Sequence, residues 1–282
     1  MKKIILLLGL LLVANSTAFA DCDYECVAPY NMNTKFRTIM SAATGANSIT
    51  EKKVESILEK EVLKIGSAEE LKIDLDSFSP RDLKNGIFKS MELTAKDVVV
   101  NDISLTSLHL KSLCNFNYIK QSGDEVVFME ALPMSFDMTM TQSAVNKTLK
   151  HEQYLKVIND FNNMASSYGL GVKISSTRIA IKNGKFYYII GFELPFVRNE
   201  QKIVLDTDLR VKNGKIDFYN TKLVSGRFNL DMKRLDFIMN YLNPLDFSVN
   251  ILKNKDAKVS VKNIDIKNNV IITDGIIVIP KD

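Results

Sequence analysis

Between residues 171 and 224 the chain alternates apolar and polar residues over four stretches, and this pattern constrains the fold most strongly. In residues 202–212, Thr207 and four aliphatic residues share one face, while Val204 is the only apolar residue on the other. A period of two is typical of a β-strand with one buried and one solvated face. Asn183-Gly184 and Asn213-Gly214 are typical of two-residue hairpin turns. We therefore predict antiparallel strands at 171–182, 185–194, 202–212 and 215–224, whose apolar face must cover a core, a partner or an apolar ligand.

Further strands and several helices are predicted on both sides of this segment. Strand patterns occupy 71–76, 134–141, 257–267, 270–279 and much of 90–120, where the phase changes between Leu105 and Leu108 and predicts a bulge. Helical spacing predicts helices at 49–65, at Pro80, after Thr141 as far as Gly169, and from Asn229 or Asp231 to Asn243-Pro244. Ser48 and Glu51 fit a capping box at the first of them. The pattern indicates an α+β fold with one domain over residues 48–282.

The N-terminus has the features of an export signal. Lys2 and Lys3 precede an apolar run over residues 4–14, and Ala18-Phe19-Ala20 fits a cleavage site. We therefore expect a signal peptide at 1–20 and a periplasmic or otherwise extracytoplasmic location. Residues 21–47 show no clear period and are interpreted as a flexible extension.

The charge balance gives no reason to expect a nucleic-acid partner. The chain carries a formal net charge of +4, and loss of Lys2 and Lys3 with the signal lowers it to +2. A nucleic-acid-binding protein favours a concentrated basic face instead.

The three cysteines are interpreted as disulfide-forming residues or buried thiols. An exported protein can form disulfides, and Cys22 and Cys26 are close enough in sequence to pair. Cys114 would then be the odd residue, although its pairing with either of the other two stays open. Three cysteines and two distant histidines fit no common metal-binding spacing, so no metal or cofactor is expected.

Residues that could carry catalysis are few. The sequence contains no nucleophile-elbow, phosphate-loop or zinc-protease motif. His109 falls inside a strand and His151 near a helix, and both are interpreted as surface or sheet-face residues. Asp206 and Asp208 lie on the polar face of a strand. We expect a protein that is not an enzyme.

Two strands have wide apolar faces that either fill a core or contact a ligand. On composition alone an ordinary core is favoured, although methionine also adapts its shape to irregular partners. The residues in question are Met134, Phe136, Met138 and Met140 on one strand, and Phe186, Tyr188, Ile190 and Phe192 on the other.

The order of elements and three short motifs resemble a known family. The motifs are Ser79-Pro80-Arg81-Asp82-Leu83-Lys84-Asn85-Gly86, Met138-Thr139-Met140-Thr141-Gln142 and Leu242-Asn243-Pro244-Leu245. Over about residues 50–280 the chain resembles the LmeA-like phospholipid-binding family of exported bacterial proteins.

This resemblance implies a long curved antiparallel sheet wrapped around amphipathic helices, as in tubular lipid-binding proteins. It also implies an apolar groove, lined by the two sets of residues above, that binds or carries phospholipid and exchanges it with a membrane surface. No catalytic residues carry over from the family. The alternative is an envelope interaction scaffold or assembly factor with a solid core and no lipid ligand.

Overall fold

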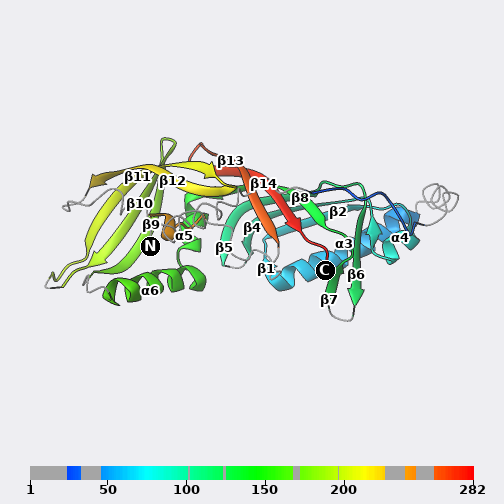
Figure 1. The fold of residues 1–282 in the computed structure, drawn as a ribbon, viewed down its shortest axis with the longest axis horizontal. Coiled ribbons are helices and arrows are strands. Elements are labelled where there is room, and N and C mark those ends of the chain that lie inside the picture. Colours follow the sequence, from blue (N-terminus) through cyan, green and yellow to red (C-terminus); the bar gives the residue numbers. More distant parts are fainter. Residues whose placement is uncertain are drawn as a thin grey trace, which may run out of the picture.

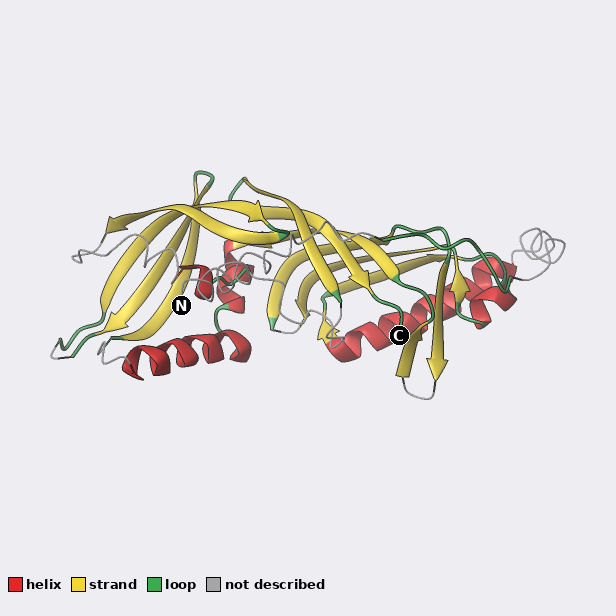
Figure 2. Ribbon diagram, viewed as in Figure 1, coloured by secondary structure: helices red, strands yellow, loops and turns green. Residues whose placement is uncertain are grey.

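Antiparallel strands form most of the computed structural model, which describes residues 24–32, 46–100, 102–122, 125–167, 172–195, 197–225, 239–245 and 257–282. The molecule is elongated and has two lobes, each a curved sheet with helices on one side (Figures 1 and 2). The predicted α+β class is confirmed. The predicted signal peptide, Cys22 and most of the predicted helix before Asn243 lie outside the described residues.

The first lobe is built on a seven-stranded sheet. Its order is β1-β4-β5-β8-β14-β13, with β2 also paired to β4, and all the pairings are antiparallel. The strands are β1 (Gly66–Ser67), β2 (Glu70–Asp76), β4 (Ser90–Val100), β5 (Ile103–Ser112), β8 (Leu132–Thr141), β13 (Lys258–Lys267) and β14 (Val270–Ile279). Helix α3 (Ala46–Ile65) packs along β2 and contacts the short α4 (Pro80–Lys84). A three-stranded sheet stands beside them, formed by β3 (Ile87–Phe88), β6 (Asn117–Ser122) and β7 (Glu125–Phe128).

The second lobe contains the strands predicted from the Asn-Gly turns. They form a four-stranded sheet in the order β12 (Lys215–Ser225), β11 (Gln201–Lys212), β10 (Lys185–Glu193), β9 (Lys173–Lys182). Both residues of Asn183-Gly184 and of Asn213-Gly214 have positive φ, as a type I′ hairpin turn requires. Helices α5 (Gln142–Thr148) and α6 (Glu152–Ser167) pack against β9.

The lobes are joined by shared packing. Helix α5 contacts β5 and β8 of the first lobe as well as β9 of the second. The turn between β11 and β12 reaches β13, where the Val261 N–H donates to the Gly214 carbonyl at 2.8 Å. One cluster of buried apolar residues includes members of both sheets.

Several predicted details are wrong. The described strands form three sheets instead of one long sheet. The helical region after Thr141 is two helices, because the chain turns at Leu149–His151 and the His151 carbonyl accepts from Leu155 N to start α6. Ser48 lies inside α3 and does not cap it, since that helix already begins at Ala46.

The disulfide joins Cys26 to Cys114, which corrects the predicted pairing of Cys22 with Cys26. Residues 24–32 lie beside the three-stranded sheet, where Tyr30 packs on Phe116 and Tyr118 and donates to Glu130 Oε1 at 2.6 Å. This segment lies within residues 21–47, the predicted flexible extension, and residues 21–23 and 33–45 lie outside the described residues. Tertiary packing brings Cys26 next to a cysteine 88 residues away in sequence.

Candidate functional site

The apolar residues of the seven-stranded sheet face one side in cross-strand rows. Leu110 of β5 lies between Leu93 of β4 and Phe136 of β8. In the next row, Leu108 lies between Ala95 and Met138. Directly opposite residues share a face of a sheet, so these rows define one apolar side, here called the inner face.

Coverage of the inner face is uneven. In these two rows the residues on β4 and β8 are buried, and Phe136 is fully inaccessible. Leu108 and Leu110, between them, are only partly buried although β5 is an interior strand of the sheet. The inner face therefore has a half-open apolar strip along β5.

Three glutamates of α3 explain why this helix lies beside β2. The Ser77, Leu75 and Ile73 N–H groups donate to Glu51, Glu55 and Glu59 at 2.8, 2.8 and 3.4 Å, and the Ser77 hydroxyl also donates to Glu51. Residues four apart lie on the same side of a helix, and alternate N–H groups of an edge strand point outward. The spacing of the glutamates along α3 therefore matches the spacing of the free N–H groups along β2.

The sheet-facing apolar residues of α3 confirm this placement. Leu58 and Val62 are partly buried and pack against the core. The helix is thus fixed over the margin of the sheet, where it packs against β1, β2 and α4.

The predicted ligand-contacting residues divide between the two lobes. All four from β8 are buried and lie on the inner face, in the strand next to the half-open strip. Phe186, Tyr188 and Ile190 are fully inaccessible in the second lobe, and Phe192 is partly buried. The prediction named neither Leu108 nor Leu110, although their alternation in the sequence placed them on an apolar strand face.

Two tyrosines show how the interior of the second lobe is filled. The hydroxyls of Tyr154 on α6 and Tyr188 on β10 contact each other, and they lie 3.0 and 3.2 Å from the Leu242 carbonyl oxygen. Because each phenol has one proton, one hydroxyl donates to the carbonyl while the other donates either to it or to its partner hydroxyl. Burial raises the pKa of both phenols, so they stay neutral donors at physiological pH. Tyr188 is therefore occupied by contacts within the chain.

The two histidines lie in different surroundings. His109 is a sheet-face residue on the side opposite the inner face, with Nε2 2.7 Å from Glu92 and Nδ1 3.5 Å from Asp137. His151 has Nε2 3.1 Å from the Ser104 hydroxyl and Nδ1 3.6 Å from Asp102.

Ser104, His151 and Asp102 contact one another in the same order as the residues of a serine–histidine–aspartate triad. Ser104 is only 2% exposed, however, and its N–H donates to the Thr148 hydroxyl at 2.9 Å. Asp102 also accepts from Gln153 N in the first turn of α6. These contacts fasten the turn between β4 and β5 to the two helices of the second lobe.

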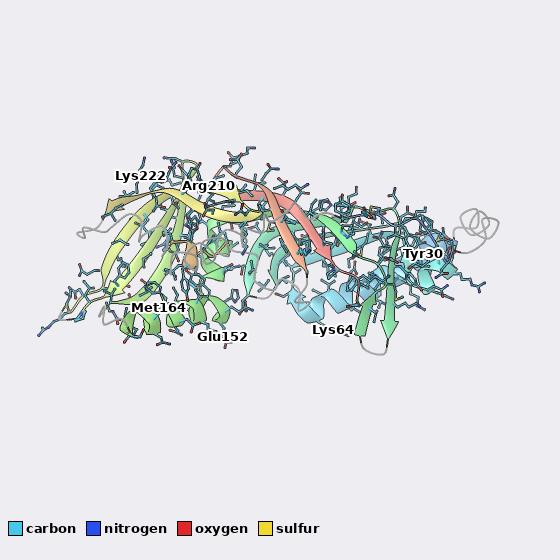
Figure 3. All side chains as sticks on the ribbon, viewed as in Figure 1. Tyr30, Lys64, Glu152, Met164, Arg210 and Lys222 are labelled. Atoms are coloured by element: carbon cyan, nitrogen blue, oxygen red, sulfur yellow. A yellow bond between two sulfur atoms is a disulfide. The ribbon has the colours of Figure 1, made fainter. Side chains whose placement is uncertain are left out.

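The outer face of the second lobe carries charged pairs. Figure 3 shows Arg210 and Lys222 on the side opposite α6, where Glu152 and Met164 lie. Lys185 Nζ donates to Asp208 at 2.7 Å and lowers the pKa of that carboxyl. Asp208 is thus paired with a lysine, as expected for the polar face of a strand.

The described residues contain no group of three or more histidine, cysteine or acidic side chains placed to hold a metal ion. In the same part of the chain, no helix has the length and apolarity to cross a membrane. Comparison with known proteins finds no match to a protein-family model, a curated protein or a solved structure.

Proposed function

We propose that this is an exported cell-envelope protein that binds phospholipid acyl chains along the inner face of the first lobe, without covalent chemistry. The half-open strip of Leu108 and Leu110 carries the proposal. An interior strand flanked by buried neighbours is ordinarily covered, so a half-open apolar strip there is suited to an apolar ligand.

The energetics suit a carrier. Burying hydrocarbon stabilises by about 0.8 kcal/mol per methylene, so a chain of about 15 methylenes gains roughly 12 kcal/mol before association costs. A bilayer offers a similar gain. A strip lined by leucine, methionine and phenylalanine can therefore exchange lipid with a membrane near equilibrium and shield it from water in between.

Three further observations support this function. Each curved sheet has its helices on one side, which suits a tubular lipid-binding arrangement (Figure 2). The sequence resembles the LmeA-like family, whose members bind phospholipid outside the cytoplasm. The apolar run at residues 4–14 supports export.

A tryptophan introduced on the strip tests the proposal directly, because the chain has no tryptophan of its own. Leu110→Trp places the indole on the inner face, and Ile272→Trp places it on the exposed opposite face. We expect phospholipid with brominated acyl chains to quench Leu110→Trp strongly and Ile272→Trp weakly. Equal quenching of the two variants would contradict the proposal. Absence of quenching in both variants would also contradict it if the purified protein yields no extracted lipid.

One observation favours the scaffold alternative. Seven of the eight residues predicted to contact lipid are buried by the chain itself. If both tryptophans stay unquenched and chemical cross-linking in cells recovers one defined protein partner, the inner face is a structural core and the scaffold function is the better account.

A further inference from the structure

Helix α3 exposes large apolar side chains on the side turned away from the sheet. Ile49, Ile57 and Leu63 are 75%, 51% and 47% exposed. At 1.5 Å per residue, Ile49 and Leu63 stand about 21 Å apart along the helix axis. No described residue of α3 is fully buried.

Lysines share this outward side. At 100° per residue, Ile49, Lys53, Ile57, Lys60 and Leu63 fall within an arc of about 120°. Lys53 and Lys60 are both exposed. The outward side of α3 is therefore apolar and basic at once.

Three acidic residues of α3 are placed elsewhere. Glu51, Glu55 and Glu59 turn toward β2, where they accept from its backbone. Among the described side chains of α3, the outward arc thus carries positive charge with no acid on it. Buried apolar area and attraction of basic side chains to anionic lipid both strengthen the binding of a surface helix to a membrane, and this side of α3 offers both.

We propose that the outward face of α3, defined by Ile49, Lys53, Ile57, Lys60 and Leu63, docks the protein on an anionic lipid bilayer. The lysines meet the lipid headgroups and the apolar side chains enter the boundary with the acyl region. This inference rests on the proposed lipid-binding function and adds the surface on which lipid is exchanged. Charge complementarity selects the partner, since a basic face attracts an anionic leaflet.

Sedimentation with vesicles tests the charges. The purified protein is mixed with phosphatidylcholine vesicles, with or without phosphatidylglycerol. We expect binding only to the anionic vesicles and weaker binding as salt rises. A lysine near an anionic surface contributes about fivefold, so Lys53→Gln with Lys60→Gln reduces binding about 25-fold.

The matched control removes the same charge from the second lobe. Lys150→Gln with Lys156→Gln changes two exposed lysines near and on α6, and we expect little loss of vesicle binding. Equal losses in the two double variants, or no vesicle binding by the unchanged protein, would overturn the docking surface.

A second pair of variants tests the apolar residues. Ile57→Ser with Leu63→Ser is expected to weaken anionic vesicle binding at least tenfold, while Leu155→Ser with Val224→Ser, also exposed, leaves it unchanged. Vesicle binding that survives Ile57→Ser with Leu63→Ser would exclude insertion by α3.

The lipid content of the same purified variants separates this inference from the proposed function. We expect α3 surface variants to keep their co-purified lipid while they lose vesicle binding. If the unchanged protein carries lipid but does not bind anionic vesicles, the docking surface alone is overturned. If the protein carries no lipid and brominated lipid causes no quenching, the proposed lipid-binding function is overturned as well.

Discussion

The two lobes protect the outer edges of their sheets with different chemistry. In the first lobe, carboxylates of α3 accept from the N–H groups of β2. In the second, Asn146 of α5 accepts from Ile179 N at 2.9 Å and donates to Ile179 O at 2.8 Å, and Asn162 of α6 makes the same pair of bonds with Ile174. A carboxylate can only accept hydrogen bonds from the N–H groups of an edge strand. A carboxamide can both accept from an N–H group and donate to a C=O group, as a neighbouring strand would.

The helices that carry these groups also differ in burial. Helix α6 buries Tyr154, Ile158, Phe161 and Ala165, whereas no described residue of α3 is buried. Helix α6 is therefore part of the core of its lobe, while α3 is held at the margin by hydrogen bonds and partial packing. This difference agrees with the proposed lipid binding at the first lobe, which rests on the half-open strip of Leu108 and Leu110.

The largest expected effect comes from truncating one aliphatic residue on each helix. Ile158→Ala on α6 is expected to cost about 2–5 kcal/mol of unfolding free energy, because it leaves a cavity in a packed core. Leu58→Ala on α3 removes a half-buried side chain and is expected to cost about 1 kcal/mol. Urea unfolding measures both, and equal costs would show that α3 is as integral to its lobe as α6.

The hydrogen-bonding difference predicts a larger loss of stability when an amide is changed to a carboxylate than when a carboxylate is changed to an amide. Asn146→Asp removes the donor to the Ile179 carbonyl and sets a negative charge against it, which is expected to cost about 1–3 kcal/mol. Glu55→Gln keeps an acceptor for Leu75 N and is expected to cost under about 1 kcal/mol. Equal losses in urea unfolding would mean that the charge of Glu55 matters more than its acceptor role.

Much of the strand pattern could be predicted because it is local. The alternation in β11 and the Asn-Gly turns set the hairpins of the second lobe, and the apolar face of β8 was placed correctly on one side of the sheet. The separation into several sheets could not be predicted, since strand pairing between distant segments leaves no periodic signal.

Side chains that bond distant backbone were misread for a similar reason. Glu51 fits a local capping box with Ser48, yet its carboxylate accepts from Ser77, 26 residues away. Sequence proximity favoured Cys26 with Cys22, whereas packing of residues 24–32 brings Cys26 to Cys114. The position of α3 beside β2 is set by such long-range bonds, and a local sequence pattern does not show them.

The smallest expected effect on stability concerns Glu200, a carboxylate in the second lobe, where amides of α5 and α6 cover the sheet edge. The Ser175 and Ser176 hydroxyls of β9 donate to Glu200 at 2.7 and 2.6 Å and lower its pKa from 4.5 to about 2. Because the folded-state pKa is lowered, this group stabilises the fold above pH 4.5, and the contribution is lost as the pH falls toward 2. Glu200 is exposed, so solvent screening keeps the contribution below about 1 kcal/mol.

Acid titration of the unfolding free energy measures this contribution. We expect Glu200→Gln to be slightly less stable than the unchanged protein at pH 6 and equal to it near pH 2. A difference that stays constant over this range would assign the effect to hydrogen-bond geometry instead of charge. Glu200 would then resemble the α3 carboxylates, which accept from backbone N–H groups, and the two lobes would differ mainly in the donor that only the amides supply.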